Sequence, residues 1–137
     1  MDKRLLLIDT SIWILSLRAD GLKKAVERTK KSLEEDTAAT TEIIILELLG
    51  GAKREQEYRE LLEDLQALPL LSITEKVWSS AFRLSFELRK KGIVVPSTDL
   101  LIAAVAIDYN CILLHFDAHF DLIAKHTPLK VESLVKE

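Results

Sequence analysis

Short apolar runs alternate along this chain with longer segments in which apolar residues recur at helical spacing. The runs at 3–8, 68–73 and 111–116 predict buried strands, and weaker patterns predict strands at 36–41 and 129–132. Strands that alternate with helices pair in parallel through right-handed crossovers. The pattern therefore predicts an α/β protein, a three-layer α/β/α domain with a central parallel sheet of four or five strands. At this length we expect a single domain over residues 1–137.

The longer segments predict helices that connect these strands. Their spacing and terminal residues place them at 10–17, 21–35, 42–49, 53–66, 74–91, 97–109 and 120–124. Gly50-Gly51 and Gly92 mark two helix ends, because glycine readily follows the last helical residue. Open parallel sheets bind ligands beyond the carboxyl ends of their strands, so functional residues are expected there.

Composition excludes several classes of protein. No stretch reaches the roughly 18 apolar residues that a membrane span needs, and the first apolar run is too short for a signal peptide. Cys111 is the single cysteine, so no disulfide can form within the chain. We therefore expect a cytoplasmic protein with no membrane partner.

The distribution of charge leaves two interpretations open for the segment at 18–31. The formal net charge is −3, which is unusual for a strong nucleic-acid binder. Residues 18–31, however, contain six basic residues and two acidic ones. This segment is either a solvated helix face or a surface that contacts phosphates. Trp13 and Trp78 could stack on bases, although their helical spacing is also that of core or interface residues.

Four acidic residues occupy notable positions, and each alone has a simple explanation. Asp9 and Asp117 directly follow predicted strands and can cap the next helix. Asp99 opens an apolar helix and can interact with the helix dipole. Glu47 interrupts an apolar helix, where an ion pair would explain it, because charged groups are rarely buried without a partner.

Taken together, the four acids favour a metal site. If the first strand lies beside the strand at 111–116, all four carboxylates can converge on one cleft. Clustered carboxylates repel one another, and a divalent cation relieves that repulsion. Oxygen ligands favour Mg²⁺ or Mn²⁺, whereas His115, His119 and His126 lack the spacing of a zinc site.

Four segments also resemble a known family in their order and spacing. They are LLLIDTSIW, IIILELLGG, STDLLIAAVA and LLHFDAHFDLIA, which span nearly the whole chain. Together they resemble the four blocks of the PIN-domain family, and most closely the VapC-type toxins of toxin–antitoxin pairs. The resemblance carries the four acidic positions over as Asp9, Glu47, Asp99 and Asp117, with Thr10 and Ser11 as supporting hydroxyls.

The fourth block departs from the family pattern at two positions. His115 stands where Ser or Thr is common, and His119 stands where many members have another acid. Either residue could alter metal affinity or the way substrate is held. Asp121 could substitute as an outer acid, although capping or simple exposure would also explain it.

The resemblance implies a Mg²⁺- or Mn²⁺-dependent endoribonuclease that hydrolyses phosphodiester bonds in RNA. It also implies a homodimer and a small antitoxin protein as partner, for which the helices at 21–35 and 53–66 are the candidate surface. Three alternatives stay open: a PIN-domain nuclease in RNA processing without an antitoxin, a catalytically silent binding module, and a receiver-like domain. The last would need a lysine after its final strand, and Lys130 comes too early.

Overall fold

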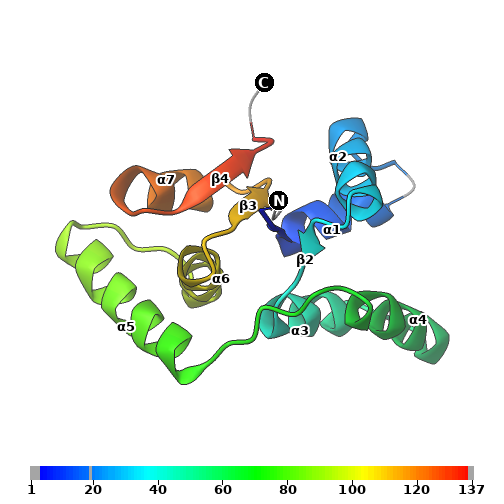
Figure 1. Cartoon of the computed structure of the whole chain (residues 1–137), viewed down its shortest axis with the longest axis horizontal. Coiled ribbons are helices and arrows are strands. Elements are labelled where there is room, and N and C mark those ends of the chain that lie inside the picture. The colour runs from blue at the N-terminus through cyan, green and yellow to red at the C-terminus, as the bar shows by residue number, and fades with distance from the viewer. Residues whose placement is uncertain (1–3, 19, 136–137) are drawn as a thin grey trace.

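A computed structural model describes residues 4–18 and 20–135. Its centre is a parallel sheet with the strand order β2-β1-β3-β4 (Figure 1). The strands are β1 (Leu6–Ile8), β2 (Ala38–Ala39), β3 (Ile112–His115) and β4 (Lys130–Ser133). Leu6, Leu7 and Ile8 pair with Ile112, Leu113 and Leu114. The first strand is therefore the direct neighbour of the strand that precedes Asp117, as the convergence of the acids requires.

Helices cover both faces of the sheet and confirm the predicted three-layer architecture. The helices are α1 (Thr10–Leu17), α2 (Lys23–Glu34), α3 (Glu42–Gly50), α4 (Glu55–Gln66), α5 (Glu75–Lys90), α6 (Ser97–Asp108) and α7 (Ala118–His126). In Figure 1, α1 and α2 lie on one side of the sheet, whereas α3, α5, α6 and α7 lie on the other. The connection from β1 to β2 runs one way across the sheet and that from β3 to β4 runs the other way. The switch point therefore lies between β1 and β3, where ligand sites of open parallel sheets form.

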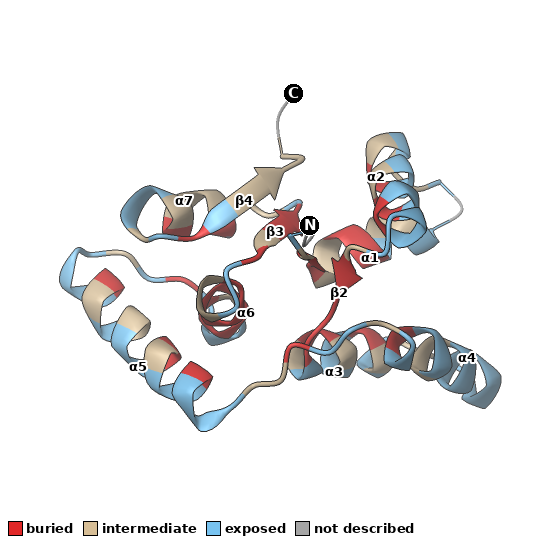
Figure 2. Cartoon of the chain, in the orientation of Figure 1, coloured by how far each residue is buried: buried red, intermediate tan, exposed pale blue. Residues whose placement is uncertain are grey.

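Helix α6 is the main helical part of the core. Its residues 100–106 are all buried, and Figure 2 shows them as an almost continuous red segment. Such a helix is apolar on all sides because it packs between the sheet and α5. Asn110 follows with a φ of 53°, a left-handed conformation that asparagine tolerates at a helix end. None of the helices in the described ranges is long and apolar enough to cross a membrane.

The prediction of a strand at 68–73 is wrong. Only one bridge forms there, between Leu70 and Thr40. Pro69 has no N–H to donate, and the Ile73 N–H is bound by the Glu42 carboxylate at 2.9 Å rather than by a strand. Among the residues that the structure describes, the segment bonds to the backbone beside β2 only at Thr40, through the Pro69 carbonyl at 3.0 Å and the Leu71 N–H at 2.8 Å. This single bridge does not extend into a ladder, so the sheet has four strands in the described residues.

Other boundaries shift by a few residues. The first strand begins at Leu6 rather than residue 3, which lies outside the described residues. The last helix is longer than the expected 120–124, because Asp117 caps it from the front and it continues to His126. Helix α5 begins with a hydrogen bond from the Val77 N–H to Thr74 Oγ1 and ends before Gly92, whose φ is 80°.

Gly21 and Gly50 give a matched pair of stability predictions. A Cβ at Gly21 would overlap the carbonyl oxygen of Leu15, whereas a Cβ at Gly50 meets nothing within 4 Å. Gly21→Ala should lower the free energy of unfolding by about 1–3 kcal/mol through this overlap. Gly50→Ala should raise it by up to about 1 kcal/mol, because alanine is the better helix former.

Urea unfolding followed by circular dichroism measures both changes. Equal effects of the two substitutions would contradict the tight connection between α1 and α2.

Candidate active site

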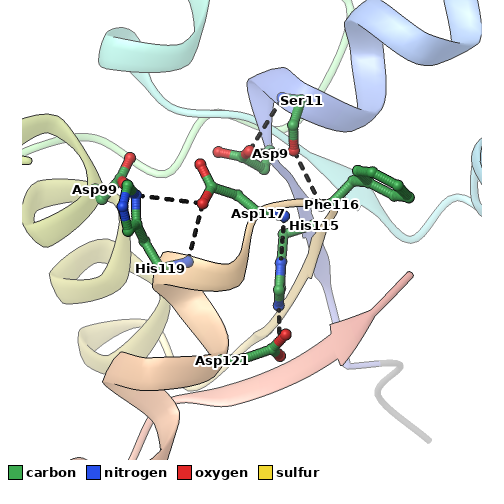
Figure 3. Close-up of polar contacts among 8 residues, drawn as sticks. All are labelled: Asp9, Ser11, Asp99, His115, Phe116, Asp117, His119 and Asp121. Carbon is green, nitrogen blue, oxygen red and sulfur yellow. Dashed lines mark hydrogen bonds and ion pairs between the residues drawn. The ribbon is translucent and has the colours of Figure 1, made fainter. Parts of the chain in front are cut away.

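Asp9 lies between β1 and α1 and is almost fully buried, at 4% exposure. Its Oδ2 accepts hydrogen bonds from the Ser11 backbone N–H at 3.0 Å and from Ser11 Oγ at 2.5 Å. Ser11 Oγ in turn accepts the Phe116 N–H at 3.0 Å, just beyond β3 (Figure 3). Ser11 therefore ties the Asp9 carboxylate to the end of the neighbouring strand. Asp9 does cap α1, but both bonds use Oδ2 and neither uses Oδ1.

Asp117 occupies the matching position after β3 and caps α7. Its Oδ1 accepts the His119 N–H at 2.9 Å. Its own backbone N–H donates to Nδ1 of His115 at 3.1 Å. His115 is fully buried, and burial is the main reason that its pKa is lowered. Its Nδ1 acts as an acceptor, so the ring proton belongs on Nε2, which faces Asp121 Oδ1 at 3.3 Å.

The position of Asp121 matches neither expectation, that of an outer acid of the site or that of a capping or simply exposed residue. Its second oxygen, Oδ2, accepts a hydrogen bond from Ser133 Oγ at 3.0 Å. Asp121 thus joins His115 to β4, and in Figure 3 it lies on the far side of His115 from Asp9. It supports the Asp117 backbone through His115 rather than serving as an additional acid of the site.

Asp99, in the first turn of α6, meets Asp117 through His119. The Nδ1 atom of His119 lies 2.9 Å from Asp99 Oδ2 and 3.3 Å from Asp117 Oδ1 (Figure 3). One ligand atom from each of these three residues falls within 4.8 Å of the others, a spacing that could hold a metal ion. The position of His119 in the sequence indicated a departure from the family pattern but not this contact with Asp99.

Glu47 completes the set from α3, but not as a buried charge. Its side chain is exposed, so the expectation of a buried carboxylate that needs a partner is wrong. Its Oε1 instead accepts a hydrogen bond from Thr10 Oγ1 at 2.6 Å. Thr10 and Ser11, the two hydroxyls after Asp9, thus hold one acid each.

The four acids interact electrostatically. Burial raises the pKa of Asp9 to about 6, and the charges of Asp99 and Glu47 add to the rise, against the hydrogen bonds from Ser11. Burial also raises the pKa of Asp99, followed by the charge of Asp117. Within residues 4–18 and 20–135, no Lys or Arg forms an ion pair with any of the four; only His119 does. The arrangement is therefore rich in oxygen donors and poor in compensating positive charge.

The basic segment at 18–31 is partly neutralised by ion pairs. Arg18 pairs with Asp20 and Lys23 with Glu27. Arg28 makes two contacts with Glu132, at 2.6 and 3.2 Å. The first two pairs favour a solvated helix face for Arg18 and Lys23, whereas Arg28 is mostly covered and joins α2 to β4.

The two tryptophans differ in exposure. Trp13 is buried in the core, whereas Trp78 is 45% exposed on α5. Trp78 lies beside Phe82, with ring centroids 6.2 Å apart, so it belongs to an apolar surface rather than to the core.

The raised pKa of Asp9 predicts a specific dependence of stability on pH. The folded state binds this proton more tightly than the unfolded chain, whose ordinary value is 3.8. The contribution of Asp9 to the free energy of unfolding should therefore fall as pH rises from about 4 to about 6 and stay low above. Asp9→Asn removes this loss, so the metal-free variant should gain stability relative to wild type over that range. Urea titrations in EDTA at several pH values measure the difference; a difference independent of pH would contradict the burial of this charge.

Comparisons with known proteins agree with this architecture. The model of the PIN domain matches residues 6–126. VapC ribonuclease Mb1587 of Mycobacterium bovis is 36% identical over 133 residues, which cover 94% of this chain and 98% of that protein. Ribonuclease VapC51 of Mycobacterium tuberculosis is 36% identical over 124 residues, which cover 88% of this chain and 86% of that protein.

Solved structures show the same fold. The structure of VapBC2 from Rickettsia felis, bound to a DNA fragment from its promoter, contains a chain that matches with a TM-score of 0.78 at 22% identity, covering 94% of this chain and 98% of that one. A chain in the structure of VapBC-1 from nontypeable Haemophilus influenzae matches with a TM-score of 0.76 at 21% identity, covering 96% and 99%. The family match, the identity to the curated relatives and the shared fold lead to one conclusion: the chain belongs to the PIN-domain family, and within it to the group of VapC ribonucleases.

Proposed function

We propose that this protein is a divalent-metal-dependent endoribonuclease, the toxin of a toxin–antitoxin pair, with its active site at Asp9, Glu47, Asp99 and Asp117. The observation that carries the proposal is the meeting of these acids at the switch point of the sheet without a Lys or Arg partner in the described residues. The relatives at 36% identity are named ribonucleases, which supports cleavage of RNA. A cytoplasmic location is part of the same proposal.

The residues present fit a divalent cation. Asp9 is buried with Oδ1 unused by its hydrogen bonds, and Asp99 and Asp117 add oxygen donors within reach of a single ion. Hard oxygen ligands suit Mg²⁺ or Mn²⁺. When bound, such an ion lowers the pKa of a water molecule and stabilises the leaving oxygen of a phosphodiester. Asp9, Asp99 and Asp117 would hold it.

Three further residues would have separate roles at the site. Ser11 fixes the orientation of the Asp9 carboxylate through two bonds to one oxygen. His115 holds the Asp117 backbone. Glu47 is exposed and is held by Thr10 through one oxygen, so its carboxylate can position the attacking water and accept its proton.

Two alternatives remain distinguishable from this proposal. A nuclease that processes RNA without an antitoxin would share the site but have no partner gene beside its own. A silent binding module would keep the fold and lose metal binding. The relatives named as VapC ribonucleases and the similar folds in solved VapBC structures favour the toxin.

Cleavage of labelled single-stranded RNA with Mg²⁺, Mn²⁺ or EDTA tests the activity. Asp9→Asn should lower the rate by more than about 100-fold, because losing a ligand should cost more than losing its supporting partner. Asp64→Asn on α4 is the matched control, since it makes the same chemical change on an exposed helix away from the site. Folded wild-type protein that neither cleaves RNA nor binds either ion would refute the nuclease and favour the binding module.

An exposed apolar surface supports the proposed homodimer. Leu46 on α3 and Trp78, Phe82 and Phe86 on α5 are 45–67% exposed. A groove lined mainly by Ile45, Leu46, Leu49, Ile73, Trp78 and Leu101 connects the two helices. Exposed apolar patches of this kind commonly mark protein interfaces. The outer helices α2 and α4 remain the proposed surface for the antitoxin.

Phe82→Asp should convert the dimer to a monomer, because it places a charge in the middle of this apolar surface. Leu33→Asp, at a 43% exposed leucine on α2, is the control and should leave the dimer intact. Light scattering coupled to size-exclusion chromatography measures the mass of each variant. Dissociation by the control alone would place the dimer interface on the other face.

A further inference from the structure

We propose that His119 supplies a nitrogen ligand to the metal site and thereby shifts its preference from Mg²⁺ towards Mn²⁺. The inference rests on the proposed function, because it assumes that Asp99 and Asp117 bind the ion. It goes beyond that function by naming the residue that selects among divalent ions.

The first support is the distance between donor atoms. His119 Nδ1 lies 2.9 Å from Asp99 Oδ2 and 3.3 Å from Asp117 Oδ1. An ion that holds six ligands at about 2.1 Å in an octahedron separates adjacent ligand atoms by roughly 3 Å. His119 Nδ1 therefore already has about the spacing of a neighbouring ligand from each carboxylate oxygen, and all three atoms lie within 4.8 Å of one another. Binding an ion through Nδ1 requires that the ring carry its proton on Nε2, so the ion takes the place of the proton that Nδ1 shares with Asp99.

The second support is the way His119 is held. It follows the cap of α7, and its backbone N–H binds the same Asp117 oxygen that faces its ring. Its side chain is 46% exposed, so core packing does not explain where the ring points. In the part of the chain that the structure describes, the polar contacts of the ring are with Asp99 and Asp117 alone.

The third support is the chemistry of the donor. Carboxylates suit Mg²⁺ and Mn²⁺ alike, whereas imidazole suits first-row transition ions, and Mg²⁺ takes oxygen ligands almost exclusively. A nitrogen donor in place of an oxygen donor should weaken the binding of Mg²⁺ more than the binding of Mn²⁺, so the ratio of Mn²⁺ to Mg²⁺ affinity should be higher with His119 than with a carboxylate at the same position.

The test compares the affinities of wild type, His119→Asp and His126→Asp for Mn²⁺ and for Mg²⁺ by calorimetry. His126 is exposed at the other end of α7, so it controls for the change in charge. An added carboxylate near the site strengthens the binding of both ions. The ratio of the two affinities therefore reports the effect of the donor atom itself. The ratio of Mn²⁺ to Mg²⁺ affinity should fall about tenfold or more in His119→Asp and stay unchanged in His126→Asp.

Pulsed electron paramagnetic resonance of bound Mn²⁺ gives a second readout that does not depend on activity. Wild type and His126→Asp should show the nitrogen coupling of a directly bound imidazole, and His119→Asp should lose it. Bound Mn²⁺ without that coupling, or an unchanged ratio of affinities, would overturn the inference and make His119 a counter-charge that competes with the ion. Wild type that binds neither ion would refute the proposed function as well, so the two failures can be told apart.

Discussion

The parallel pairing of β1 with β3 is the contact on which the site depends. It aligns Ile8 with Leu114, so that Asp9 and Asp117 leave the sheet at the same edge, on either side of the switch point. Ser11 then joins the two strand ends, donating to Asp9 and accepting from Phe116. Helix α6, buried through its middle, brings Asp99 to the same edge. The positions of the acids thus follow from backbone pairing and core packing.

That arrangement has an electrostatic cost. Burial raises the pKa of Asp9 and of Asp99, and neighbouring carboxylates raise both further. In the described residues, His119 is the one basic side chain that forms ion pairs with any of the four acids, and its partners are Asp99 and Asp117. A fold stabilised by its apolar core can tolerate such a cluster, and a bound cation would remove most of the repulsion. The clustered carboxylates therefore lower the stability of the folded state locally and create a negative potential that attracts cations.

Much of this was predictable, because the decisive signals are local. A short apolar run followed by an acid places Asp9 and Asp117 at strand ends, and the helix expected at 10–17 forms α1 over the same residues. The segment at 68–73 has the composition of a strand, but within the described part of the chain its backbone hydrogen bonds to the sheet are limited to Thr40, and beyond them it is bound by the side chains of Thr41 and Glu42. The exposure of Glu47 and the contact of His119 with Asp99 depend on how distant helices pack, which spacing along one chain does not encode.

The acids gathered at this edge should bind a divalent ion. Anomalous diffraction from a crystal grown with Mn²⁺ would locate that ion. One or two anomalous peaks are expected among the side chains of Asp9, Asp99 and Asp117. Well-ordered carboxylates with no peak between them, in a crystal that holds Mn²⁺ elsewhere, would contradict this expectation.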